Sequence, residues 1–220
     1  AFRAARLLIA TGRTPNTRNV GLEAAGVALA DDGAVKVDEY LRSSVPHIFA
    51  AGDVIGTQHG NQLATPVGAH DGAIASQNAF AEATGQGLRS VEHRVIPRTI
   101  FTDPQIGIVG ITDEEALAAG HNCWCNTVQM ELVPRAGAIR DTRGVIKMVA
   151  DDDTKEVLGV SMVCINAGEV IHEAAMALRF RATIDDYIDM IHVYPTMAEA
   201  LKIVAISRYK DPAKLSCCAE

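Results

Sequence analysis

The first half of the chain carries short apolar runs that end in turns. Residues 6–10, 34–37 and 47–50 are dominated by apolar side chains, and the last of these runs is followed by Gly52-Asp53. Apolar runs of about four to eight residues bounded by turn residues are typical of buried strands. The pattern therefore predicts three short strands, the third of which leads directly to Asp53.

A longer pattern follows these runs and predicts a helix. Thr65 suits the N-cap position, Pro66 suits the first helical position, and Gly85 suits the position beyond the end. The stretch after Gly85 is polar and predicts a domain boundary. We therefore divide the chain into residues 1–92 and residues 93–220.

The second half combines strand patterns with helical patterns. Two strands are expected on either side of Asp103-Pro104, and a short helix is expected to begin at Thr112, where Glu115 has capping-box spacing. Three more strand patterns and three helical patterns follow, at residues 124–132, 144–151 and 156–164, then at 167–180, 184–190 and 196–209. A hairpin turn is predicted at residues 151–153. The expected fold is an α/β region followed by an α+β domain.

Composition and charge exclude two classes of protein. The net charge is −7 and Lys and Arg are not clustered, which excludes a basic nucleic-acid-binding surface. No apolar run approaches the roughly 18–20 residues of a membrane span. The five cysteines are an odd number, which disfavours a disulfide framework and favours a reducing, cytoplasmic location. Because the chain begins at Ala1 and enters an apolar run almost at once, we expect it to be a piece of a longer protein.

The Gly52-Asp53 pair is the first candidate for binding chemistry. Glycine permits a ligand to approach the backbone closely, and Asp53 follows a predicted strand, where ligands bind in open α/β folds. A carboxylate at that place suits a sugar or ribityl hydroxyl group. Gly-Asp is also a common β-turn sequence, so the pair alone leaves both interpretations open.

Four motifs occur in the order found in a known enzyme family. They are IATGRTPNT, HIFAAGDV, TPVGAHDG and FTDPQIGIVG. This ordered set resembles the flavin-dependent pyridine nucleotide–disulfide oxidoreductases. The resemblance implies that residues 1–92 are the C-terminal part of a FAD-binding Rossmann-like domain, and that residues 93–220 are a dimerisation domain that builds a homodimer. It assigns FAD-binding roles to six residues, namely Thr11, Gly12, Gly52, Asp53, Ala64 and Thr65.

Three elements of that family have no counterpart in the chain. They are the Gly-rich FAD turn, the redox-active cysteine pair and the Gly-rich turn for NAD(P)H. Gly21 and Gly26 do not supply the G-x-G-x-x-G spacing. The resemblance therefore implies that the NADPH site lies outside this chain, and we expect the isolated chain to be inactive and to bind FAD unstably.

The segment HVYPTMAEAL departs from the family's pattern at one position. Many relatives read His-x-His-Pro-Thr here, where the second His is the acid/base of thiol–disulfide exchange and a Glu orients it. In this chain Tyr194 holds the place of that His, while Thr196 and Glu199 are kept. Tyrosine titrates near pH 10 and is a poor proton shuttle at neutral pH, and His192 lies two positions away. Glu199 has a second interpretation, because Thr196 and Glu199 also have capping-box spacing.

Two adjacent cysteines lie in the last eight residues, AKLSCCAE. Together with Tyr194 and the segment VPRAGAIRDTRG, this tail resembles the mercuric reductases, a branch of the same family. The resemblance implies that Cys217 and Cys218 bind Hg(II) and deliver it to the partner subunit, with Tyr194 and Glu199 in the catalytic site and electrons from NADPH through FAD. Hg(II) is soft and prefers thiolate ligands.

The sequence leaves other functions open. One is a dihydrolipoamide dehydrogenase-like disulfide reductase, which Tyr194 disfavours, and another is a non-catalytic module that only dimerises and binds metal. Lys210 and Lys214 are hypothesised to lower the pKa of the tail thiols.

Two other groups of polar residues have weaker interpretations. His121, Cys123 and Cys125 alternate on a predicted strand and share one face, although Cys-x-Cys is unusual spacing for a zinc site. His172 and Glu173 are expected to form a solvated or interface pair on the predicted helix.

Overall fold

The computed structural model describes residues 3–215, which form two compact units. The first unit ends at His93 and the second begins at Arg94. Each unit has a hydrophobic core of its own. Among the described residues, no helix has the length and apolar character that crossing a membrane requires.

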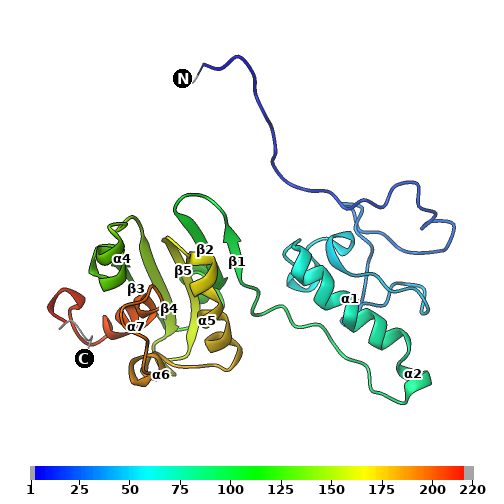
Figure 1. The fold of residues 1–220 in the computed structure, drawn as a ribbon. Helices are drawn as coiled ribbons and strands as arrows, with labels where there is room; N and C mark the ends of the chain where they lie inside the picture. The colour runs from blue at the N-terminus through cyan, green and yellow to red at the C-terminus, as the bar shows by residue number, and fades with distance from the viewer. Residues whose placement is uncertain (1–2, 216–220) are drawn as a thin grey trace. The chain divides into compact units, whose positions relative to one another are not determined.

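The first unit consists of helices joined by irregular segments (Figure 1). Its helical elements are η1 (Gly52–Ile55), η2 (Gln58–Gly60), α1 (Thr65–Ala79) and α2 (Ala81–Thr84). Its small core consists of Leu41, Ile55, Ile74 and Ala75. Because Ile55 belongs to η1 and Ile74 to α1, this core holds the turn after residue 51 against the long helix.

The three strands predicted in the first unit do not form, and that prediction is wrong. Residues 6–10 have no strand structure, and Leu8 is 87% exposed. The other two runs contribute only isolated bridges, between Val35 and Leu29 and between Phe49 and Arg42 among others. A strand requires a neighbour that completes its hydrogen-bond ladder. The described residues of this unit form only isolated β-bridges, without a continuous ladder. Apolar character alone therefore does not produce strands.

The helix predicted from Thr65 is confirmed, with a small change at its start. The N-cap is Ala64 rather than Thr65, and no side chain caps the helix. Pro66 lies in the first turn as predicted. The helical stretch is interrupted at Phe80, and Gly85 ends α2 in the left-handed conformation that glycine favours.

The second unit contains a five-stranded antiparallel sheet, as the strand patterns predict. The strands are β1 (Arg98–Ile100), β2 (Gln105–Gly110), β3 (Cys123–Gln129), β4 (Val145–Asp151) and β5 (Val157–Cys164), in the spatial order β1-β2-β5-β4-β3. Its helices are α3 (Asp113–Ala118), α4 (Pro134–Ile139), α5 (Ala167–Arg179), α6 (Ile184–Asp189) and α7 (Glu199–Ile206), with short turns η3 (Met130–Leu132) and η4 (Pro212–Lys214). The expected α+β domain is therefore present.

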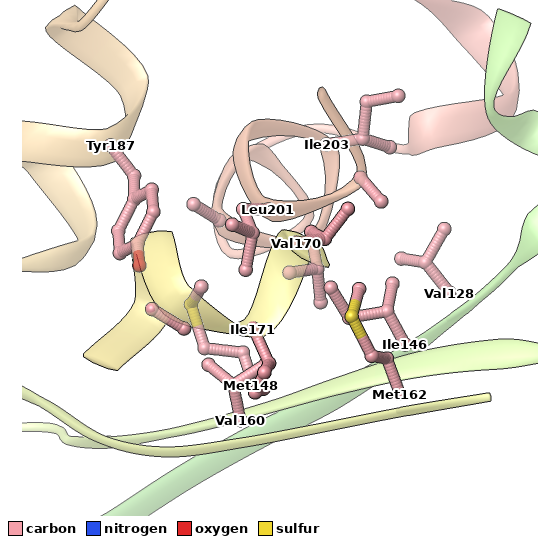
Figure 2. Packing of buried hydrophobic residues seen from close by; sticks show 14 of the residues in the cluster. Val128, Ile146, Met148, Val160, Met162, Val170, Ile171, Tyr187, Leu201 and Ile203 are labelled. Atoms are coloured by element: carbon pink, nitrogen blue, oxygen red, sulfur yellow. The ribbon is translucent and has the colours of Figure 1, made fainter. Parts of the chain in front are cut away.

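The core of the second unit lies between the sheet and helices α5 and α7. In the register of the sheet, Val128 pairs with Ile146, and Ile146 pairs with Met162, so these side chains share one face. They point toward residues such as Ile171 and Leu201 on the two helices (Figure 2). Each fully buried side chain of this kind contributes about 1.5–3 kcal/mol to folding.

Local hydrogen bonds form at the predicted helix start and at the predicted hairpin turn. Thr112 and Glu115 form the expected capping box at the start of α3. At the predicted hairpin turn, the Asp151 carboxylate accepts hydrogen bonds from the backbone of Asp153 and Thr154, and His121 Nδ1 lies 2.7 Å from Asp151 Oδ2. The Thr154 backbone N–H, followed by His121, lowers the pKa of Asp151 to about 2. The Asp151 carboxylate therefore stays ionised and holds the turn together through these hydrogen bonds.

Candidate functional site

The Gly52-Asp53 turn is held tightly against the start of α1. Gly52 has φ of +77°, and a Cβ added to it would lie 3.2 Å from the Cα of Gly68. The buried Asn61 side chain donates from Nδ2 to the carbonyls of Gly52 and Gly56, each at 2.9 Å. Glycine is therefore required at position 52 by both its conformation and its packing. The turn is a preformed element that presents Asp53 beside the helix start.

Asp53 lies at an open groove together with a residue that sequence reasoning missed. The Asp53 side chain is 51% exposed, and Arg13 Nη1 lies 3.2 Å from its Oδ2. Arg13 also donates to the carbonyl of Leu63. The groove has a volume of ≈ 410 Å³ and is lined by Arg13, Thr14, Pro15, Asn16, Asp53, Val54 and Leu63. Arg13 directly follows the Thr11-Gly12 pair of the motif IATGRTPNT, and this position within the motif could have identified it as a site residue.

Thr11 and Gly12 themselves lie on an exposed segment of the chain. Gly12 has φ of +78°, and apart from its two chain neighbours no atom of the described residues lies within 4 Å of a Cβ built on it. Glycine is thus required there by backbone conformation alone. The described residues bring Arg13, rather than Thr11 or Gly12, into contact with Asp53.

The first turn of α1 offers uncapped backbone donors. Ala64 is the N-cap and supplies no side-chain hydrogen bond, and the first turn contains no acidic residue. The first N–H groups of a helix have no partner within the helix, and the helix dipole adds positive potential there. Close by in sequence, Gln62 Oε1 is buried without a hydrogen-bond partner among residues 3–215. These features fit a ligand with acceptor atoms or negative charge.

In the second unit, Tyr194 and Glu199 lie in one short segment but differ in exposure. Tyr194 is 49% exposed, whereas Glu199 is 5% exposed. Glu199 Oε2 accepts from the Thr196 backbone N–H at 3.0 Å. The predicted capping box is half formed, because Thr196 Oγ1 is buried and has no hydrogen-bond partner in the described part of the chain, and α7 begins at Glu199. Glu199 therefore holds the backbone of the segment that displays Tyr194.

His192 pairs with Glu173, which sequence reasoning assigned to His172 instead. His192 Nε2 lies 2.9 Å from Glu173 Oε1, and the His192 side chain is 4% exposed. The hydrogen bond to Glu173 raises the pKa of His192. The expected pairing of His172 with Glu173 is thus wrong, because the chain before Tyr194 folds back over α5. Since adjacent residues on a helix point in different directions, only the fold could provide this partner.

The proposed metal set of His121, Cys123 and Cys125 does not assemble. His121 binds Asp151 instead, and Cys125 Sγ lies 3.8 Å from Asp113 Oδ2. Within residues 3–215, the group of three possible ligands that does come together is a different one, His70, Asp71 and His93. Cys164 is also no candidate, since burial raises the pKa of its thiol to about 11.

The tail cysteines Cys217 and Cys218 lie outside the described residues. Both lysines suggested to act on them are among the described residues. Lys214 Nζ lies 3.5 Å from Asp211 Oδ2. Lys210 lines a groove of ≈ 400 Å³ in the second unit, together with Lys202 and Tyr209.

Comparison with known families gives two matches that together cover most of the chain. The family model described as "Pyridine nucleotide-disulphide oxidoreductase" matches residues 1–83. The model described as "Pyridine nucleotide-disulphide oxidoreductase, dimerisation domain" matches residues 96–205. The second match spans the sheet and the helices that cover it.

Curated proteins similar to this chain include mercuric reductases from several bacteria. Those of Staphylococcus aureus, Shigella flexneri and Streptomyces lividans are 40%, 41% and 42% identical, each over 99% of this chain. The chain covers 38%, 37% and 44% of these relatives, so it spans less than half of their length.

Solved structures of similar fold include a flavoprotein disulfide reductase. The HOCl-induced flavoprotein disulfide reductase RclA from Escherichia coli has a TM-score of 0.79 and 31% identity, over 91% of this chain and 44% of that one. LpdA from Mycobacterium tuberculosis has a TM-score of 0.77 and 27% identity, over 90% of this chain and 41% of that one.

Proposed function

Because this chain belongs to the pyridine nucleotide-disulphide oxidoreductase family, we propose that it is the C-terminal part of a homodimeric flavoprotein that reduces Hg(II) to Hg(0) with NAD(P)H. The observation that carries the proposal is the 40–42% identity to curated mercuric reductases over nearly the whole chain. The reaction balances as NADPH + Hg²⁺ → NADP⁺ + H⁺ + Hg⁰. The chain contributes part of the flavin site, the dimerisation domain and the residues that handle the metal substrate.

The residues around Gly52 fit the part of the FAD site that the family assigns to them. The close approach of Gly52 to Gly68 fixes the turn, and Asp53 presents an exposed carboxylate that can accept hydrogen bonds from hydroxyl groups of a ribityl chain. Ala64 and Thr65 open the helix whose uncapped N–H groups suit a polar ring edge. When bound, FAD supplies the two-electron relay between NAD(P)H and the metal.

The residues of the second unit supply the substrate chemistry in this proposal. Cys217 and Cys218 capture Hg(II) as thiolate ligands and release it by ligand exchange to the partner subunit. Tyr194, with its exposed side chain, lines the receiving site, and Glu199 keeps its segment in place through the Thr196 backbone. The dimerisation domain, matched over residues 96–205, joins the two subunits. A reducing compartment such as the cytoplasm would keep the tail thiols free.

A disulfide reductase is the second candidate function, because similar solved structures include a flavoprotein disulfide reductase. The complete gene product should be purified with its flavin and assayed for NADPH oxidation with either Hg(II) bound to thiols or lipoamide as oxidant. We expect oxidation that depends on Hg(II) and releases volatile mercury, and little activity with lipoamide, since Tyr194 replaces the acid/base His. Turnover of lipoamide alone would overturn the mercury proposal, and failure with both oxidants would favour a non-catalytic module.

Replacing Asp53 tests the flavin site separately from the mercury chemistry. In the complete protein, Asp53→Ala is expected to weaken FAD retention by about tenfold, because a hydrogen-bonding carboxylate is lost. Little change in stability is expected, since the Arg13–Asp53 ion pair is exposed. The measurement is the flavin-to-protein absorbance ratio after gel filtration at increasing dilution. Asp31→Ala removes an exposed carboxylate of the same unit and serves as the control. Equal flavin retention in both variants would argue against a role for Asp53.

A further inference from the structure

We propose that His70, Asp71 and His93 form a binding site for a divalent transition-metal ion such as Zn²⁺. This site lies in the first unit, apart from the tail cysteines, and does not depend on the proposed mercury chemistry. Its possible ligand atoms all lie within 4.8 Å of one another. His70 Nδ1 is 3.1 Å, and His93 Nε2 is 2.9 Å, from the same oxygen, Asp71 Oδ1.

The buried carboxylate of Asp71 is the feature that points to a cation. Asp71 is 0% exposed, and its second oxygen, Oδ2, is buried with no hydrogen-bond partner among residues 3–215. An ionised carboxylate that is removed from water and left with an unsatisfied oxygen is costly unless a cation compensates it. A metal ion held between this carboxylate and the two imidazoles would supply the missing positive charge.

The hydrogen bonds of His93 orient it as a metal ligand. Its Nδ1 lies 2.9 Å from the carbonyl oxygen of His59, which can only accept, so the proton must be on Nδ1. In the neutral ring, Nε2 then carries a lone pair, and it faces the Asp71 carboxylate, which also only accepts. A metal ion between Nε2 and the carboxylate would satisfy both groups. A metal-bound His usually donates its other N–H to a carbonyl or carboxylate in this manner.

The segment that carries His93 is fixed along α1 by other contacts. Asn78 donates from Nδ2 to the carbonyl of Arg89 at 2.8 Å and accepts from the Arg89 N–H at 2.8 Å. Val91 N–H donates to the carbonyl of Glu39 at 2.9 Å. The three ligands therefore come from two segments whose spacing is already set. The side chain of His93 is 3% exposed whereas that of His70 is 48% exposed, so a metal ion can enter from the His70 side.

The donor set selects the class of ion. Two imidazole nitrogens and one carboxylate suit Zn²⁺ and its neighbours, while Mg²⁺ and Ca²⁺ prefer sites made only of oxygen atoms. Zinc bonds of about 2.0–2.2 Å give ligand atoms about 3.4 Å apart in a tetrahedral site. The two contacts with Asp71 Oδ1, at 2.9 and 3.1 Å, need only a small expansion, and the two imidazole nitrogens lie within 4.8 Å of each other. Three protein ligands leave the fourth position for water or another ligand.

One positive group opposes the ion and provides a diagnostic test. Arg89 Nη2 lies 3.5 Å from His70 Nε2, on the side of the ring away from Asp71. Coordination through Nδ1 places the His70 proton on Nε2, where it faces the guanidinium. We therefore expect Arg89→Gln to tighten metal binding.

The test uses the full-length protein with Cys217→Ala/Cys218→Ala, so that tail thiols do not bind the probe. After treatment with EDTA, equilibrium dialysis against Zn²⁺ is expected to show one more bound ion than in the same protein with His70→Ala or Asp71→Asn. At that site these substitutions should weaken binding by at least about tenfold. His172→Ala, which removes a histidine outside the group, is expected to leave binding unchanged.

Zinc X-ray absorption and thermal unfolding provide the second readouts. The zinc ion that the parent binds and the His70→Ala variant does not should have only nitrogen and oxygen ligands in the X-ray absorption spectrum. In thermal unfolding, Zn²⁺ should raise the Tm of the parent more than the Tm of Asp71→Asn. Asp71→Asn keeps the side-chain shape, which guards against misfolding as an explanation, and circular dichroism checks the fold of each variant. Equal Zn²⁺ binding by the parent and both ligand variants, or sulfur neighbours for the ion in question, would overturn the proposal.

Discussion

Removing both tail cysteines, with Cys217→Ala/Cys218→Ala, is expected to lower Hg(II)-dependent NADPH oxidation by about tenfold or more when Hg(II) is presented on strong thiol ligands. Hg(II) leaves such ligands by exchange with other thiols, and two adjacent cysteines supply both incoming ligands. With weakly bound Hg(II), the ion reaches the receiving site without help, so we expect a change of no more than about twofold. The measurement is the initial rate of NADPH oxidation by the complete flavoprotein, with Hg(II) bound to an excess of a small thiol or to chloride.

The matched control removes the same number of thiols from elsewhere. Cys123 is half-buried and Cys125 is exposed on β3, and neither belongs to a group of three ligands in the described part of the chain. Cys123→Ala/Cys125→Ala should therefore keep the parent's rate with both forms of Hg(II). If the tail variant matches this control when Hg(II) is presented on strong thiols, the delivery role of the tail is wrong, even if the protein still reduces mercury.

The largest expected effect on folding comes from Gly144→Ala, which should destabilise the second unit by at least about 4 kcal/mol. Gly144 has φ of +104°, and a Cβ built on it would lie 1.8 Å from the carbonyl oxygen of Val163. Val163 belongs to β5, which pairs with β4 from Val145 onward, so the clash is with the backbone of the sheet itself. Relief requires separation of two central strands and loss of the core beneath them. Urea unfolding followed by circular dichroism measures the free energy of unfolding.

Gly137→Ala is the control for this prediction. Gly137 lies in α4 of the same unit, and apart from its chain neighbours and the backbone of its own helix, no described atom is within 4 Å of a Cβ built on it. Alanine favours helices over glycine by about 1 kcal/mol, so the control should leave stability unchanged or raise it. A Gly144→Ala variant as stable as Gly137→Ala would show that the strands can separate without cost, contrary to the packing of the sheet.

The sequence was most informative where partners lie close along the chain. The hairpin at residues 151–153, the Thr112–Glu115 capping box and the strands around Asp103-Pro104 were all predicted, because alternation and short-range hydrogen bonds encode them. The same patterns failed for residues 6–10. Apolar composition shows that a segment can be buried, but a strand forms only with a ladder partner, and the described residues supply none there.

The candidate sites divide in the same way. Motifs in the sequence predicted Asp53, Tyr194 and the Cys217-Cys218 pair as site residues, since the order of the motifs resembles one family, and these roles stay predictions. Partners far away in the chain were missed, namely Arg13 for Asp53 and Glu173 for His192. The group of His70, Asp71 and His93 was missed for the same reason.

By itself, then, the sequence determined the α+β domain and the family resemblance, because residue type and spacing carry this information. Only the tertiary structure decided which acids and bases meet. It brought His93 back onto α1 beside a buried Asp71, and it pressed Gly52 against Gly68. Such contacts depend on how segments far apart in the chain pack, and packing is a property of the whole core rather than of any local pattern.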